Sequence, residues 1–232
     1  MAVSGDVPPT DDAVEQAIAS VFGDRAPVAR QYARLLAEQG VLRGLIGPRE
    51  VDRLWDRHVL NCALVGDLIE ADASVIDVGS GAGLPGLVLA IRRPDLRLTL
   101  VESMARRVQW LTDASEALGL ENVVVRHGRA EDLNGIIHAD VVIARAVAPL
   151  VQLLPWCLPL IRPGGTLLAL KGARAEREIQ DAQESLHALG CASPELVELG
   201  AAEMPWCTRV VRVRPGTSAV RGRFTRRRGR SR

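Results

Sequence analysis

The chain has 232 residues, of which 47% are hydrophobic and 25% are charged, as in globular proteins with a sizeable core. No apolar run approaches the roughly 18 residues of a membrane-spanning helix, and the proline- and acid-containing start lacks the pattern of a signal peptide. The formal net charge is only +1. We therefore expect a cytoplasmic protein with no membrane contact.

Helical periodicity dominates the N-terminal part of the chain. It predicts two helices within Asp11–Gln39 and another over Arg49–Ile69. From residue 72 onward, short apolar runs alternate with helical patterns. The expected strands are Ser74–Val78, Leu96–Val101, Asn122–Arg126, Asp140–Ala144, Thr166–Leu170, Val197–Leu199 and Arg209–Val213, and the expected helices are Leu84–Arg92, Met104–Leu118, Leu150–Leu160 and Ala173–Leu189.

This alternation predicts an α/β fold with a parallel sheet and helices on both faces. We expect a helical extension over residues 1–71, the sheet domain over 72–214 and a disordered arginine-rich tail over 215–232. The tail holds seven arginines in the last twelve residues, among them Arg226, Arg227 and Arg228. Such a segment either binds RNA or another polyanion or is a solubilising end without a partner.

A glycine-rich turn follows the first expected strand. The sequence there is Asp77-Val-Gly79-Ser-Gly81-Ala-Gly83, and Glu102 ends the second strand. Glycines let the backbone approach a ligand closely, and the helix behind the turn begins with free N–H groups. A carboxylate at the end of the second strand can accept both ribose hydroxyls of an adenosine. The pattern predicts a nucleoside-containing cofactor at this edge.

Two cofactors compete for this turn. Gly81, Gly83 and Gly86 also fit the dinucleotide pattern GxGxxG. However, the glycines begin one step earlier, in the Asp-x-Gly-x-Gly-x-Gly form used for S-adenosylmethionine, and Pro85 stands in the first helical turn. The acid at Asp77 suits the ammonium group of S-adenosylmethionine and would repel a pyrophosphate. We favour S-adenosyl-L-methionine.

Five segments together resemble one family of methyltransferases. The order of these segments is similar to that in the bacterial small-subunit rRNA methyltransferase G family, also called glucose-inhibited division protein B. The segments are Trp55-Asp-Arg57-His58, Asp77 to Gly86, Arg129-Ala130-Glu131, Ala144-Arg145-Ala146 and Leu170-Lys171-Gly172. The resemblance implies a Rossmann-like, seven-stranded class I methyltransferase sheet with an N-terminal helical extension.

The same resemblance implies a reaction and a set of site residues. The family transfers a methyl group from S-adenosylmethionine to nitrogen 7 of a guanine in 16S rRNA, so the expected partner is 16S rRNA or the small ribosomal subunit. Arg57 and His58 are expected to line the RNA or cofactor cleft, although a packing pair is the simpler explanation. The expected cofactor contacts are Gly79, Leu84, Ala130, Glu131 and Arg145, in addition to Asp77, Gly81, Gly83 and Glu102.

The expected chemistry is consistent with the residues after the later strands. Guanine nitrogen 7 has a free lone pair, so its methylation needs alignment but no base. The fourth strand is followed by Arg145 and the fifth by Lys171, the only lysine of the chain. A single ammonium can hold oxygen 6 or a phosphate and leave nitrogen 7 free, whereas an arginine fork would occupy both atoms. We expect Arg145 and Lys171 to act at the reaction centre.

Two other functions remain as alternatives. A nicotinamide-dependent oxidoreductase would need a hydride-transfer constellation, but the only tyrosine, Tyr32, lies far along the chain from the only lysine. A non-enzymatic RNA-binding protein would fit the arginine-rich tail and would not need the glycine turn.

The four cysteines, at positions 62, 157, 191 and 207, lack the spacing of zinc ligands. We therefore expect no metal site, and we expect a monomer.

Overall fold

The computed structural model describes residues 10–200 and 206–216. It contains a seven-stranded sheet in the order β3-β2-β1-β4-β5-β7-β6. Strands β1 to β5 are parallel to one another, whereas β7 runs antiparallel to both of its neighbours, β5 and β6, so the sheet is mixed. The expected Rossmann-like sheet is therefore confirmed. The strands are β1 (Ser74–Val78), β2 (Arg97–Glu102), β3 (Val123–His127), β4 (Ala139–Arg145), β5 (Ile161–Lys171), β6 (Glu195–Leu199) and β7 (Thr208–Val213).

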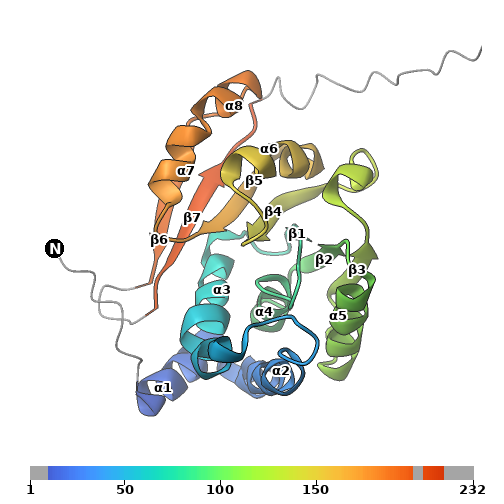
Figure 1. Cartoon of the computed structure of the whole chain (residues 1–232), viewed down its shortest axis with the longest axis vertical. Coiled ribbons are helices and arrows are strands. Elements are labelled where there is room, and N and C mark those ends of the chain that lie inside the picture. Colours follow the sequence, from blue (N-terminus) through green and yellow to red (C-terminus); the bar gives the residue numbers. More distant parts are fainter. Residues whose placement is uncertain (1–9, 201–205, 217–232) are drawn as a thin grey trace, which may run out of the picture.

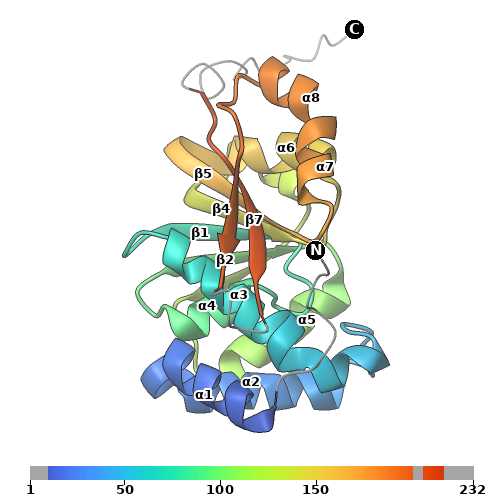
Figure 2. The same ribbon diagram turned by 90° about the vertical axis from the view of Figure 1, so that its left-hand side faces the viewer.

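Helices cover both faces of the sheet, as expected for this class of fold. In Figures 1 and 2, α1 to α5 lie on one side of the sheet, and α6, α7 and α8 lie on the other. The helices are α1 (Asp11–Phe22), α2 (Ala26–Gln39), α3 (Leu60–Leu64), α4 (Gly86–Arg92), α5 (Ala105–Ala117), α6 (Leu150–Cys157), α7 (Ala175–Asp181) and α8 (Gln183–Ala188). Within the described residues, no helix is long and apolar enough to cross a membrane.

Alternating side chains of the strands build two separate cores. In β1, Val75 packs with the helices of one face, whereas Ile76 packs with those of the other. Strand β4 repeats the pattern with Val141 and Val142. This follows from the two-residue period of a strand, whose successive side chains point to opposite faces. Both faces are buried, which explains the nearly continuous apolar runs of these strands.

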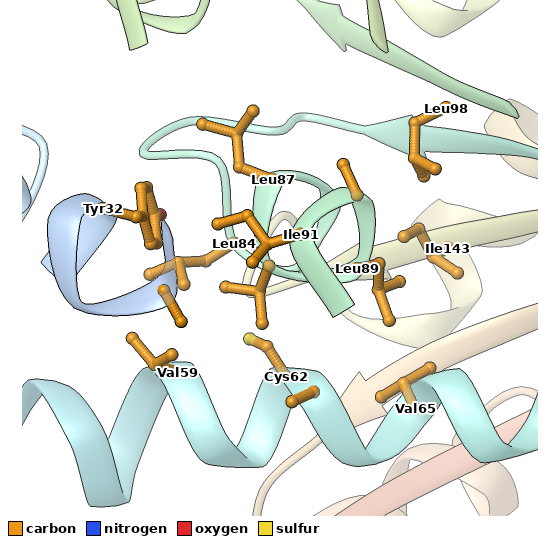
Figure 3. Packing of buried hydrophobic residues seen from close by; sticks show 14 of the residues in the cluster. Tyr32, Val59, Cys62, Val65, Leu84, Leu87, Leu89, Ile91, Leu98 and Ile143 are labelled. Atoms are coloured by element: carbon orange, nitrogen blue, oxygen red, sulfur yellow. The ribbon is translucent and has the colours of Figure 1, made fainter. Parts of the chain in front are cut away.

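The N-terminal helices belong to the larger of these cores. Ile18 of α1 and Tyr32 and Leu36 of α2 are fully buried and lie in one hydrophobic cluster with Leu87 and Ile91 of α4. Figure 3 shows Tyr32 on the side of α2 that faces α4, with the helical segment that carries Cys62 running below both. The helical extension therefore shares its core with the sheet. The division at residues 71 and 72 stays a prediction.

Three elements differ from the expected ones. The helix expected over Arg49–Ile69 is a succession of short segments that includes a π-helical turn, Trp55–Val59. The helix expected over Ala173–Leu189 is interrupted at Ala182, between α7 and α8. Strand β5 begins at Ile161 and includes the expected turn at residues 163–165. Its pairing with β4 shifts register between Ile161 and Thr166. Tertiary packing overrides the local pattern at each of these places.

Candidate active site

The glycine-rich turn connects β1 to α4 at the carboxyl edge of the sheet. Gly79, Gly81 and Gly83 have φ values of +70°, +54° and +98°, which L-residues with a side chain rarely adopt. The N–H groups of Gly79 and Ser80 donate to the carbonyl of Val101 at 2.8 and 3.2 Å. The turn is thus fastened to the end of β2, and the predicted role of these glycines in forming it is consistent with their backbone conformations.

Glu102 connects the end of β2 to the same turn. Its carboxylate accepts the N–H of Gly81 at 3.0 Å and the N–H of Met104 at 2.9 Å, and the residue is only 3% exposed. The hydroxyl of Ser103 also donates to this carboxylate, at 3.4 Å. A carboxylate offers about four acceptor positions, so these three bonds leave capacity for a ribose hydroxyl. Glu102 therefore fits the ribose of an adenosine, and it also holds the turn in place, which the sequence did not indicate.

Asp77 lies beneath the turn and is fully buried. Its Oδ2 accepts the N–H of Gly86 at 3.0 Å at the start of α4, while Oδ1 has no hydrogen-bond partner within the described residues. Burial raises the pKa of Asp77 to about 7, because the apolar surroundings disfavour the charged form. The contact that the structure shows is with the N-terminus of α4, and the predicted contact with a cofactor ammonium stays a prediction.

The remaining predicted cofactor residues lie at the same edge of the sheet. Ala130 and Glu131 begin a short helical turn after β3, with Ala130 buried and Glu131 exposed. Leu84 follows the glycine turn and is 9% exposed. Because β1, β2 and β3 are adjacent and parallel, their carboxyl ends bring these residues together in the manner that ligand sites of open α/β sheets use.

Arg145 ends β4 and joins the N-terminal extension to this edge. Its guanidinium donates to the carbonyl of Arg57 at 3.1 Å and to Nδ1 of His58 at 2.5 Å. It also lies 3.4 Å from Sγ of Cys62. The side chain of His58 in turn lies 2.5 Å from Glu50 through Nε2. Arg57 and His58 therefore lie beside Arg145, and their predicted place in an RNA or cofactor cleft stays a prediction.

The charge state of His58 follows from these neighbours. Burial and the cation of Arg145 lower the pKa of His58, in that order of importance. A neutral ring that accepts from Arg145 at Nδ1 must carry its proton on Nε2, from which it donates to Glu50. Ala146, which comes next after Arg145, has a φ of +55°. A non-glycine residue in this conformation stores strain of a kind often found at functional sites.

Lys171 ends β5, as predicted, but its ammonium is held inside the protein. The side chain is 7% exposed, and Nζ lies 2.7 Å from Glu178 of α7 and 2.7 Å from the carbonyl of Ala148. The same oxygen of Glu178 accepts the N–H of Leu150 at 2.8 Å. Lys171 thus fastens the loop between β4 and α6, and its predicted contact with RNA stays a prediction.

Sequence reasoning did not indicate Glu50, Cys62 or Glu178, because nothing in the local pattern distinguishes these residues from ordinary helix positions. The predicted RNA-binding residues Arg226, Arg227 and Arg228 lie outside the described residues.

Two surface hollows lie apart from the glycine turn, one between α1, α2 and the segment 51–55, the other between α5 and β3. Neither is lined by a predicted site residue. In the part of the chain that the structure describes, no acidic, histidine or cysteine cluster could hold a metal ion.

Comparisons with known proteins identify the family of this chain. The family described as rRNA small subunit methyltransferase G matches residues 25–205. The ribosomal RNA small subunit methyltransferase G of Thermobifida fusca is 51% identical, over 93% of this chain and 89% of the relative. The protein of the same description from Streptomyces avermitilis is 48% identical, over 100% of this chain and 96% of the relative.

Solved structures share the fold at low sequence identity. A putative transferase from Pyrococcus horikoshii has a TM-score of 0.54 at 16% identity, over 74% of this chain and 65% of that chain. TYW2 of M. jannaschii, solved in complex with AdoMet, has a TM-score of 0.53 at 15% identity, over 70% of this chain and 78% of that chain. With a family match over most of its length and relatives near 50% identity, the chain belongs to the rRNA small subunit methyltransferase G family.

Proposed function

We propose that this protein transfers the methyl group of S-adenosylmethionine to nitrogen 7 of a guanine in 16S rRNA. Family membership supports the reaction and the substrate. The structural observation that carries the proposal is the convergence of the glycine turn, Glu102 and Arg145 at one edge of the sheet. That edge is where open α/β sheets bind their ligands.

The turn and its neighbours fit S-adenosylmethionine. Gly79, Gly81 and Gly83 provide a backbone that a ligand can approach, and Glu102 has acceptor capacity left for the ribose. Leu84, Ala130 and Glu131 would surround the adenosine. When bound, the cofactor supplies a methyl carbon activated by its sulfonium charge.

The acceptor atom decides what the protein must do. Guanine nitrogen 7 reacts through its own lone pair, so no residue has to remove a proton from it. The work of the protein is to hold the base in line with the methyl carbon, at about 3 Å. Arg145 lies at the end of β4, with its position set by His58 and the carbonyl of Arg57. We assign to it the orientation of the base or of the cofactor.

Unpaired arginines at the carboxyl edge support RNA as the substrate. All five are exposed and have no ion pair or side-chain hydrogen bond within the described residues, namely Arg57, Arg106, Arg126, Arg129 and Arg174. At the opposite edge, Arg92, Arg93 and Arg162 are each paired with an aspartate, whereas Arg97 is exposed and has no ion pair within the described residues. Free guanidinium groups can neutralise phosphates and release counterions. At this edge the strands lie side by side in the order β3-β2-β1-β4-β5. The five arginines therefore extend over four strand spacings, about 19 Å, which is enough to follow a stretch of RNA backbone.

The test is methylation of 16S rRNA from cells that lack this protein. Naked 16S rRNA and assembled small subunits from such cells are each incubated with the purified protein and labelled S-adenosylmethionine, and nucleosides are identified by mass spectrometry. We expect one new 7-methylguanosine in at least one of the two substrates. Methylation at another atom, or no methylation with either substrate, would contradict the proposal. A titration with S-adenosylmethionine and with NAD serves as the control for the oxidoreductase alternative.

The remaining expectations on partners and location stay proposals. We propose that the protein acts as a monomer in the cytoplasm, where ribosomal RNA is its substrate. Light scattering of the purified chain at several concentrations tests the first part. A molar mass that rises to twice 25.0 kDa would show a dimer instead.

A further inference from the structure

One carbonyl in the glycine turn accepts two hydrogen bonds from buried aromatic side chains. The hydroxyl of Tyr32 donates to the carbonyl of Ala82 at 3.0 Å, and the indole N–H of Trp110 donates to the same oxygen at 2.9 Å. Tyr32 is 0% exposed and Trp110 is 1% exposed. A carbonyl oxygen has two lone pairs, so these two donors occupy both.

The two donors come from distant parts of the chain. Tyr32 lies on α2 in the N-terminal extension, and Trp110 lies on α5 after the second strand. Figure 3 shows Tyr32 beside Leu84, the residue that follows the glycine turn. Ala82 stands between Gly81 and Gly83, both with positive φ. The aromatic pair therefore holds a segment of the backbone whose conformation the flanking glycines restrict only weakly.

Buried tyrosines and tryptophans usually find a hydrogen-bond partner, so a partner alone would mean little. Here both side chains donate to the same atom, the carbonyl oxygen of Ala82 in the turn. If Ala82 moved away, both aromatic groups would be left buried without an acceptor, which is strongly unfavourable. The pair thus favours one conformation of the turn over the others that its glycines permit.

We propose that Tyr32 and Trp110 are positioning residues that hold the glycine turn in its ligand-binding conformation. The N-terminal extension then contributes to the cofactor site through Tyr32. The inference rests on the proposed cofactor position at this turn. Preorganisation of a binding loop raises affinity by removing the ordering cost from the binding step. The effect therefore falls on cofactor affinity and much less on methyl transfer by the loaded enzyme.

The variants Tyr32→Phe and Trp110→Phe each remove one donor and keep an aromatic ring. A net hydrogen bond corresponds to a change of about three- to tenfold in an equilibrium constant, so each variant is expected to weaken S-adenosylmethionine binding by that factor. Because both donors share one acceptor, we expect the double variant to deviate from the product of the two effects. Calorimetric titration of the full chain gives these dissociation constants, and single-turnover methylation at saturating cofactor should change less than twofold.

Ser115→Ala is the matched control. Ser115 lies on α5, as Trp110 does, and its buried hydroxyl donates to the carbonyl of Leu111 at 2.7 Å. The variant removes a buried hydroxyl donor from the same helix without touching the turn. We expect little change in thermal stability, because alanine is the better helix former, and an unchanged dissociation constant for S-adenosylmethionine.

Amide hydrogen exchange of the cofactor-free protein gives a second measurement that does not depend on activity. In the two aromatic variants, residues 79–83 should exchange faster than in the wild type, while β4 should stay protected. Wild-type affinity together with wild-type exchange in Tyr32→Phe or Trp110→Phe would overturn the inference and leave the proposed function intact. A wild-type protein that does not bind S-adenosylmethionine would instead overturn the proposed function. If one variant does not fold, the other carries both measurements.

Discussion

Lys171 offers the sharpest test of the reaction centre, because two roles compete for it. Its ammonium lies between Glu178 and the carbonyl of Ala148, so it can act by holding the loop between β4 and α6. It also ends β5 at the edge where the guanine must approach, so it can act on the RNA. Lys171→Ala removes both roles, Lys171→Arg keeps the charge as a planar fork, and Glu178→Gln removes only the internal partner.

The structure sets the expected magnitudes. Exposed ion pairs contribute at most about 1 kcal/mol, whereas breaking a buried pair costs about 3–5 kcal/mol. Lys171 is 7% exposed and Glu178 is 25% exposed, so we expect Lys171→Ala to lower the free energy of unfolding by about 2–3 kcal/mol. One charge-assisted hydrogen bond in the transition state would be worth ~1.5–3 kcal/mol, which corresponds to a loss of turnover of about tenfold or more.

The assay is methyl incorporation into small subunits, with cofactor titration for each variant. We expect Lys171→Ala and Lys171→Arg to keep cofactor affinity and to lose turnover by about tenfold or more. If Lys171 acts on RNA, Glu178→Gln keeps turnover; if it acts through the loop, Glu178→Gln loses as much as Lys171→Ala, and the double variant is no worse. Wild-type turnover of Lys171→Arg would refute the argument that a fork blocks nitrogen 7.

Four further predictions concern the cofactor turn, its neighbours and the tail. Gly79→Val should abolish S-adenosylmethionine binding, since a Cβ there would lie 2.7 Å from Val147 at a φ of +70°. Calorimetry checks this, with Gly119→Val as the control at a φ of +61° and nothing within 4 Å. Glu102→Ala should weaken cofactor affinity at least about tenfold through lost hydrogen bonds to a charged group, and an unchanged dissociation constant would remove Glu102 from the site. Because the native pKa of Asp77 is raised to about 7, the folded state binds the proton more tightly, so this contribution to stability is present at low pH and is lost as pH rises through about 7. Urea unfolding at several pH values should show that slope in the wild type and not in Asp77→Asn; equal slopes would contradict it. Deleting Arg221 to Arg232 should flatten the salt dependence of RNA binding by ~0.7–0.9 per lost phosphate contact, with single-turnover methylation at saturating RNA near wild type; a wild-type salt slope would leave only a solubilising role.

The order of strands and helices could be predicted because each parallel strand is buried on both faces. The run Ser74–Val78 is uninterrupted and ends in glycines, and the structure has the strand at those residues. The break at Ala182 could not be predicted, since no glycine or proline stands between α7 and α8. The two short helices pack against α6, and α7 also packs against β7; such packing is not a local property of the sequence.

The positions of the candidate site residues could be predicted for the same reason. Glu102 and Arg145 could be placed at one edge of the sheet because each ends a parallel strand, and ligands of this fold bind at the carboxyl ends of such strands. The contact between Arg145 and His58 joins residues that are 87 positions apart, and the contact between Tyr32 and Ala82 spans 50 positions. No periodicity connects such pairs, so only the packed helices reveal them.

The place of β7 in the sheet has a consequence for the order in which the sheet is completed during synthesis. Among the described residues, strand β6 pairs only with β7, and β7 is made after β6. Until residues 208–213 leave the ribosome, β6 has no neighbour, and β5 presents a bare edge that includes Leu167, Leu168 and Leu170. A bare apolar edge invites pairing with other chains. The hydroxyl of Thr208, the first residue of β7, donates to the carbonyl of Asn61 in α3 at 2.7 Å. The pairing of β7 therefore completes the sheet and joins it to the N-terminal extension in one step. Chains that stop short of residue 208 should therefore aggregate rather than persist as folded fragments.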